Sequence, residues 1–243
     1  MRLRKTCSYL ITLATLFLPA LRGGSIIVPG GDEAQSNLGN SDPFNIGAFN
    51  IDSMRYQQVY ASSEFSTAIL ITGIDFRVSG LLDGFTSTLP SIQMNLSTTR
   101  AAVDGLSEVF ADNVGADDTV VFAKGPLTLS GAAGGQPGDL KSFDVHIAFT
   151  TPFLYDPSSG NLLLDVRNFG GGVTAPFSTT QSETDSTSRV ASFDGNADRG
   201  NTDSSGLITQ FDFDPVATPE PSGVVLAALG LVAIVLFRLR ASS

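Results

Sequence analysis

The strongest constraint on the fold is a two-residue alternation of apolar and polar side chains in the middle of the chain. In GIDFRVSG, residues 73–80, the side chains of Ile74, Phe76 and Val78 fall on one side, and Asp75 and Arg77 fall on the other. The same alternation runs through SIQMNLST (91–98), SFDVHIAFTT (142–151) and GLITQFDFD (206–214). Successive side chains of a strand point to opposite faces, so the pattern predicts half-buried strands in antiparallel sheets.

Segments rich in Gly, Pro, Asn, Asp and Ser separate these strands and supply residues suited to turns. Clear examples are 131–139, 155–161 and 170–186. Further strand candidates between them are RYQQVYA, DTVVFA, PLTLS, NLLLDVRNF and SRVASF. Many short strands joined by polar turns predict an all-β ectodomain, an antiparallel β-sandwich with a jelly-roll-like arrangement.

One segment, RAAVDGLSEVFA (100–111), has the spacing of a helix instead. Val103, Leu106 and Phe110 could share one helical face, but Gly105 lowers the helix propensity of the segment. A short helix and an irregular loop both remain open here.

The charge of the chain excludes one large class of partner. Between Gly24 and Ala217 there are eight basic and twenty-three acidic residues. Such a strongly acidic region repels the phosphates of nucleic acids and anionic lipid headgroups. We therefore expect no nucleic-acid partner.

The residues that usually carry catalysis are scarce. Cys7 is the single cysteine and His146 the single histidine, and His146 lies on the polar side of an alternating strand. The carboxylates are numerous but scattered, and the motifs of common hydrolases and nucleotide-binding proteins are absent from the sequence. The sequence thus predicts a non-enzymatic protein with no catalytic residue, no cofactor and no metal ligand.

The segment DGNADRGNTDSSG (194–206) is the one candidate for calcium. Asp194, Asn196 and Asp198 have the spacing at which oxygen ligands can surround Ca²⁺. The helix-loop-helix calcium pattern then needs Gly and Glu where this chain has Arg199 and Ser205. A solvated turn between strands is the favoured interpretation, and calcium stays the alternative.

The amino-terminal residues 1–23 have the pattern of a secretory signal peptide. Arg2, Arg4 and Lys5 precede a short apolar run, and Pro19 and small residues follow it. Since Cys7 lies before the apolar run, the secreted chain would contain no thiol. We expect export through the inner membrane.

The carboxyl-terminal residues combine a proline-rich linker (214–221) with a terminal apolar segment (222–243). The apolar run 224–237 has no polar face, and Arg238 and Arg240 follow it directly. A run that is apolar on every side and ends in basic residues predicts a single membrane-spanning helix with its tail in the cytoplasm.

This carboxyl-terminal order resembles the PEP-CTERM sorting signal of bacterial exported proteins. Pro219, Glu220, Pro221 and Ser222 match its sorting motif, the apolar run matches its helix, and Arg238 and Arg240 match its basic stop. The resemblance covers about 26 residues and is strengthened by the leader. It implies recognition by an exosortase, an integral-membrane protease or transpeptidase, with cleavage near residues 219–222. Exopolysaccharide is a further partner that it implies.

Together these features predict a signal peptide (1–23), a β-sandwich ectodomain (24–213), a linker (214–221) and a sorting helix with its tail (222–243). The protein would be a single-pass membrane intermediate on its way to the cell surface or the extracellular matrix. The leading hypothesis is a non-enzymatic surface or matrix protein. A carbohydrate-binding module and a polysaccharide-active enzyme are the alternatives.

Overall fold

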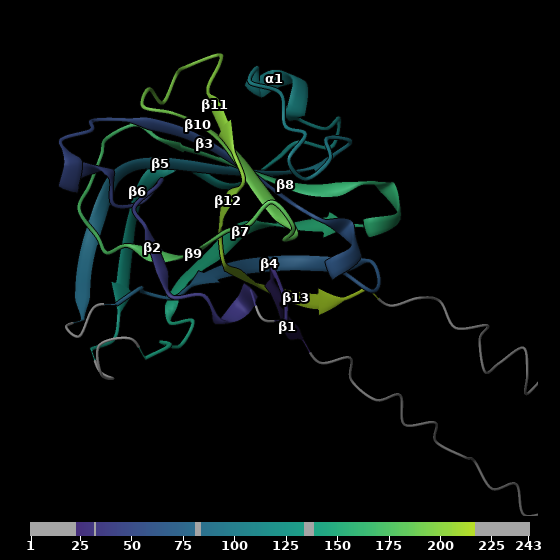
Figure 1. Ribbon diagram of the computed structural model, residues 1–243, viewed down its shortest axis with the longest axis horizontal. Coiled ribbons are helices and arrows are strands. Elements are labelled where there is room, and N and C mark those ends of the chain that lie inside the picture. The colour runs from purple at the N-terminus through teal and green to yellow at the C-terminus, as the bar shows by residue number, and fades with distance from the viewer. Residues whose placement is uncertain (1–22, 32, 81–83, 134–138, 217–243) are drawn as a thin grey trace, which may run out of the picture.

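The computed structural model describes residues 23–31, 33–80, 84–133 and 139–216. These residues form an all-β protein in which every paired strand runs antiparallel to its neighbours (Figure 1). The strands are β1 (Gly24–Val28), β2 (Leu38–Asn40), β3 (Met54–Tyr60), β4 (Ile69–Phe76), β5 (Phe85–Thr99), β6 (Thr119–Gly131), β7 (Val145–Tyr155), β8 (Asn161–Asn168), β9 (Phe177–Gln181), β10 (Thr187–Ser192), β11 (Asn201–Asp203), β12 (Ser205–Leu207) and β13 (Thr209–Pro215). The short helices are η1 (Glu33–Gln35), η2 (Ile46–Phe49), η3 (Ser62–Glu64), α1 (Phe110–Asn113) and η4 (Pro157–Ser159).

The strands form three sheets. A four-stranded sheet has the order β1-β13-β4-β7, and a six-stranded sheet has the order β11-β10-β3-β8-β5-β6. A small third sheet has the order β12-β9-β2. Four pairs among the eight main strands are nested in the sequence, so that each pair encloses the next one. They are β1 with β13, β3 with β8, β4 with β7, and β5 with β6. The chain therefore resembles one long hairpin rolled into a sandwich-like body.

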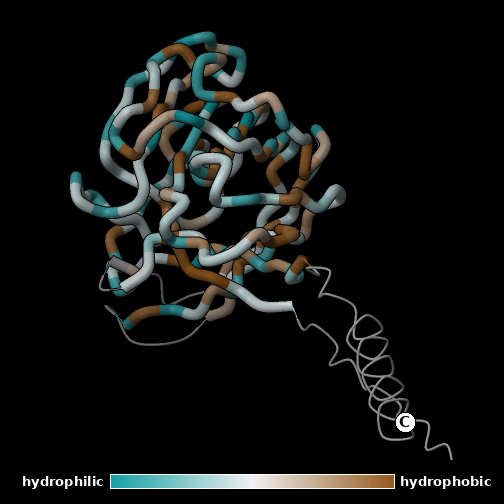
Figure 2. Tube along the Cα trace, turned by 90° about the vertical axis from the view of Figure 1, so that its right-hand side faces the viewer, coloured by the Kyte–Doolittle hydropathy of each residue, from teal (hydrophilic) through white to brown (hydrophobic). Residues whose placement is uncertain are grey.

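The main core lies between the four-stranded and six-stranded sheets. Ile71, Ile74 and Ile147 from the first sheet meet Met94 and Val166 from the second in one buried cluster. These residues alternate with outward-facing polar ones, as the two-residue period predicts. Figure 2 shows the resulting mixture of hydrophobic and hydrophilic residues along the strands.

Aromatic rings fill one end of this core. The rings of Phe76 and Phe177 stack with their centroids 5.4 Å apart, and Phe44 packs obliquely against both. Aromatic pairs of this kind add about 0.5–1.5 kcal/mol each beyond the area that they bury. They tie the four-stranded sheet to β9 of the small sheet.

Strand β3 departs from the alternation that the sequence pattern predicts, because all seven of its residues are buried. Its outer face is covered by a second, smaller cluster of Val59, Leu106, Phe110, Leu163 and Val190. Figure 1 shows α1, which begins at Phe110, lying beyond the outer face of the six-stranded sheet. The polar residues of this strand therefore need partners inside the protein.

A buried ion pair satisfies the outer face of β3. Nη2 of Arg55 lies 2.7 Å from Oδ2 of Asp165 on β8, and both side chains are more than nine-tenths buried. The side-chain amide of Gln57 donates to the same carboxylate oxygen at 2.8 Å and to the backbone oxygen of Phe110. Asn113 then donates to Oε1 of Gln57. This network joins the six-stranded sheet to the segment that covers it.

The inner face of β3 uses Gln58 in a different way. Its amide nitrogen donates to the backbone oxygen of Leu207, and its amide oxygen accepts from the backbone N–H of the same residue, both at 2.8 Å. The side chain of Gln58 thus makes with β12 the same two hydrogen bonds, one donated and one accepted, that the backbone of a neighbouring strand would make. Gly206 lets β12 lie close to β10, because a Cβ there would lie only 2.3 Å from Oγ1 of Thr187, and it would also approach Nε2 of Gln58 to 3.3 Å.

The segment 100–111 is largely not the helix that its spacing allowed. Residues 101–109 form turns and irregular backbone, and only Phe110–Asn113 is helical. Asp104 adopts a left-handed conformation with φ of 57°, which ends any right-handed helix at that point. Leu106 and Phe110 are nevertheless buried together, so the apolar spacing serves packing without a continuous helix.

The first and last described strands lie side by side. Gly24 pairs with Phe213 and Val28 with Thr209 along β1 and β13 (Figure 1). Among the described residues, no helix is long and apolar enough to cross a membrane. The expected signal peptide (1–23, apart from residue 23) and the terminal apolar segment lie outside the described residues.

Candidate functional site

Three ligand-type side chains meet on the outer face of the four-stranded sheet. Asp75 on β4 lies directly opposite His146 on β7 and, on its other side, opposite Gln210 on β13. Asp212 lies two residues after Gln210 along β13, opposite Gly73 of β4. The strand register therefore brings together residues that are far apart in the sequence.

The distances within this group are short. Nδ1 of His146 lies 2.6 Å from Oδ1 of Asp75 and 3.6 Å from Oδ2 of Asp212. The amide of Gln210 donates to Oδ2 of Asp75 at 2.8 Å. In the described part of the chain, this is the one set of three or more Asp, Glu, His or Cys ligand atoms lying within 4.8 Å of each other.

Burial differs between the three side chains. That of Asp75 is only 6% exposed, whereas those of Asp212 and His146 are 34% and 54% exposed. Burial raises the pKa of the Asp212 carboxyl above its usual range, the charge of Asp75 raises it further, and His146 opposes both. The group thus concentrates negative charge beside one imidazole, at a point that solvent reaches.

A glycine provides the space in which the three side chains meet. Gly73 lies between Asp212 and the strand that carries His146. A Cβ at this position would approach Cε1 of His146 to 3.3 Å and the backbone oxygen of Ile147 to 3.1 Å. A side chain at this position would therefore press on the imidazole of His146 and on the backbone of β7.

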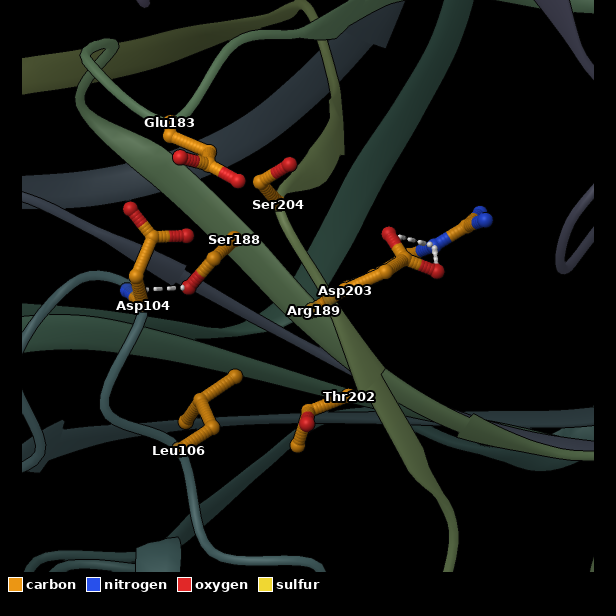
Figure 3. Close-up of a pocket in the computed structure, with 8 residues that line it drawn as sticks. All are labelled: Asp104, Leu106, Glu183, Ser188, Arg189, Thr202, Asp203 and Ser204. Carbon is orange, nitrogen blue, oxygen red and sulfur yellow. Dashed lines mark hydrogen bonds and ion pairs between the residues drawn. The ribbon is translucent and has the colours of Figure 1, made fainter.

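A separate pocket of about 500 Å³ lies over β10 and β11 (Figure 3). Eight residues line it, namely Asp104, Leu106, Glu183, Ser188, Arg189, Thr202, Asp203 and Ser204. Nε of Arg189 donates to both carboxylate oxygens of Asp203, at 2.9 and 3.0 Å. The backbone N–H of Asp104 donates to Oγ of Ser188 at 2.8 Å. All lining residues except Leu106 are polar, and none has an aromatic ring, which is the usual stacking surface for a sugar.

The first part of the calcium candidate, residues 194–200, forms a turn between β10 and β11, and the rest of it runs through β11 into β12. Oδ1 of Asp194 accepts the backbone N–H of Asn196 at 2.9 Å. The backbone oxygen of Asp198 accepts the N–H of Phe110, and Arg199 pairs with Glu108 at 2.8 Å. These bonds are those of a turn that docks against the covering segment, rather than of a turn surrounded by solvent.

The other predicted site residues cannot be placed against these groups. Pro219, Glu220, Pro221 and Ser222 of the sorting motif, with Arg238 and Arg240 of the basic stop, lie outside the described residues. Their assignment stays a prediction. His146 faces outward and is half-exposed, as its place in an alternating strand indicated.

Sequence reasoning did not bring His146 together with Asp75 and Asp212. His146 and Asp75 are 71 residues apart, and only the β4–β7 register makes them neighbours. The alternation does indicate one property of the site, because it places all three residues on the polar faces of their strands. The alternation gives the face of each strand, but it does not say which strands pair.

Comparison with known proteins gives no family. No protein-family model, no curated protein and no solved structure matches this chain. The class that the structure supports is therefore an antiparallel all-β protein with a sandwich-like body.

Proposed function

We propose that this protein is a non-enzymatic component of the bacterial cell surface or extracellular matrix, exported and then sorted by an exosortase through its carboxyl-terminal signal. The observation that carries the proposal is the order of a Pro-Glu-Pro motif, an apolar run and two arginines, together with a leader of the secretory type. Exopolysaccharide is the matrix partner that the sorting signal suggests.

We further propose that the ectodomain is a jelly roll. Strand orders β1-β13-β4-β7 and β3-β8-β5-β6, with pairing from the outside of the sequence inward, support this assignment. Jelly rolls occur widely as lectin and capsid domains, which bind or assemble rather than catalyse.

The first and last strands of the described domain are neighbours, so both terminal segments join the domain on the same side. Because β1 pairs with β13, the leader and the proline-rich linker join the domain at neighbouring strands (Figure 1). During sorting, the domain would be tethered at this edge, and loops distant from it would face away from the membrane.

The test is intact-mass analysis of the mature protein from its native host. We expect a mass that lacks the leader and all residues beyond a cleavage point near 219–222. Retention of residues 224–243 would overturn the processing step and leave a permanent membrane anchor. A second sample from a strain without exosortase activity serves as the control and should keep the terminal segment.

A second candidate function is carbohydrate binding in the pocket of Figure 3. The pocket presents carboxylates, hydroxyls and Arg189 on a concave surface, and sugar hydroxyls bind to such groups. A glycan array probed with and without EDTA tests this, with Asp203→Asn as the pocket variant and Asp156→Asn as the surface control. Release of reducing ends from any bound glycan would instead favour the polysaccharide-active enzyme.

A further inference from the structure

We propose that Asp75, His146 and Asp212 form a binding site for a zinc ion on the outer face of the four-stranded sheet. The sequence alone predicted no metal ligand, so the inference comes from the strand register. It is independent of the proposed sorting function, since it concerns only described residues of the domain.

The spacing of the donor atoms suits a tetrahedral ion. Zinc–nitrogen and zinc–oxygen bonds are about 2.0–2.2 Å long, so two ligand atoms at the tetrahedral angle lie about 3.3–3.5 Å apart. The two distances from Nδ1 of His146, 2.6 Å to Asp75 and 3.6 Å to Asp212, bracket that range. Shifts of less than 1 Å in side chains therefore convert the observed hydrogen-bonded group into a ligand set.

The charge of the group favours a cation. Asp75 is a buried carboxylate, and in the described part of the chain its ion-pair partner is His146 rather than a lysine or an arginine. Asp212 adds a second carboxylate to the same nitrogen. Buried carboxylates require a compensating positive charge, and a divalent ion supplies more of it than one imidazole can.

The surroundings of the group are those of a prepared site. Gln210 donates to the carboxylate oxygen of Asp75 that His146 leaves free, which fixes the orientation of that carboxylate. Metal sites commonly hold their ligands by such outer hydrogen bonds. Gly73 keeps the centre free of a side chain, and the exposure of His146 leaves room for a water molecule as fourth ligand.

The donor set selects among common metals. Calcium prefers six to eight oxygen ligands, and magnesium keeps several waters and an octahedral shell. An imidazole nitrogen suits zinc and related transition metals, and zinc also accepts Asp and Glu oxygens as ligands. We therefore expect Zn²⁺ to bind more tightly than Ca²⁺ or Mg²⁺.

The single histidine makes a direct test possible. The full-length chain, prepared without a polyhistidine tag and labelled with ¹⁵N-histidine, gives one pair of imidazole signals, from His146. Titration with ZnCl₂ after removal of metals should shift the Nδ1 signal and saturate at one ion per chain. Parallel calorimetry gives the dissociation constant, and CaCl₂ should produce no such shift.

Variants at the exposed ligands complete the test. We expect Asp212→Asn to weaken zinc binding at least tenfold and His146→Gln to abolish it. Asp194→Asn, a carboxylate change at a distant turn, should leave the dissociation constant unchanged. Thermal unfolding without metal confirms that each variant is folded.

Two results would overturn the proposal. One is an imidazole signal of His146 that does not move with excess zinc. The other is a zinc-induced shift of equal affinity in the Asp212→Asn protein, because that outcome means that the carboxylate of Asp212 is not a ligand and the three residues do not form the site.

Discussion

Removal of the Asp165 carboxylate should be among the most destabilising single changes in this protein. Asp165→Ala deletes the acceptor of the 2.7 Å ion pair and leaves the guanidinium of Arg55 in a site where its side chain is 8% exposed. The remaining contacts of Arg55 are the backbone oxygen of Ala197 at 3.2 Å and the ring of Phe110 at 4.5 Å. Neither contact replaces a full negative charge.

The magnitude follows from this burial. Breaking a buried ion pair by removing one partner costs about 3–5 kcal/mol, because the other charge is left uncompensated. For a domain of this size, 1 kcal/mol corresponds to about 2–4 °C in Tm, so the expected loss is roughly 6–20 °C. Since total stabilities are typically about 5–15 kcal/mol, a large share would be lost.

The assay is urea unfolding followed by far-ultraviolet circular dichroism, supported by thermal scans. Glu108→Ala is the matched control, because it breaks the Arg199 pair, whose side chains are 65% and 58% exposed. Exposed pairs contribute about 0–1 kcal/mol. The double variant Arg55→Met, Asp165→Leu should regain most of the lost stability, since an apolar pair carries no stranded charge.

Equal losses for Asp165→Ala and Glu108→Ala would refute the reasoning. They would mean that the guanidinium of Arg55 finds water or another acceptor once its carboxylate is gone. Failure of the double variant to regain stability would instead assign the loss to packing around Phe110.

Three further changes should have measurable effects. Gln58→Ala should cost about 1–3 kcal/mol in urea unfolding, because it removes the side-chain acceptor of the buried backbone N–H of Leu207, whereas the C=O of Leu207 keeps the hydroxyl of Thr209 as a donor. Gly206→Ala should lower Tm by several degrees, since its Cβ would contact Thr187 at 2.3 Å; an unchanged Tm would contradict the tight approach. Burial raises the pKa of Asp42, so the folded state favours its protonated form and stability falls as the pH rises through that raised pKa from about 4. Asp42→Asn should therefore gain stability relative to wild type between pH 4 and 7, and a constant difference across this range would refute the titration.

The sequence predicted most of the longer strands because each of them has its own amphipathic pattern between turn residues. It did not predict β1 or β2, and β9 lies within the segment 170–186 that its composition assigned to turns. Strand β7 shows the amphipathic pattern: Val145, Ile147 and Phe149 are buried, and His146 and Ala148 between them are exposed. Such a pattern needs only one apolar layer beneath the strand, so the information is local. The all-β class is confirmed on this ground.

Strand β3 shows where local information ends. Its sequence MRYQQVY contains Gln57 and Gln58 on opposite faces, and both side chains are fully buried. The reason is tertiary, because the α1 segment covers one face and the small third sheet approaches the other. In the sequence, a strand whose polar residues are covered on both faces has the same pattern as a strand with one face in solvent. The two cases differ only in the elements that pack on them.

The candidate metal site fails to appear in the sequence for a related reason. Asp75, His146 and Asp212 each satisfy the alternation of their own strand, and none carries a motif with fixed spacing. Their meeting depends on β4 lying between β7 and β13, and on the register that sets His146 opposite Asp75. Pairing of distant strands is decided by the whole fold rather than by neighbouring residues.

The pairing of β1 with β13 also has a consequence for how the chain assembles. β1 is an edge strand with β13 as its single neighbour in the four-stranded sheet, and β4 also requires β13 on one side. A chain made from its amino terminus thus produces the first strand long before the partner of that strand exists. Contacts between residues so far apart in the sequence slow folding, and the four-stranded sheet cannot be completed until β13, the last described strand, has been made. A chain that ends before residue 209 therefore lacks the strand that joins β1 to β4, and its four-stranded sheet is incomplete.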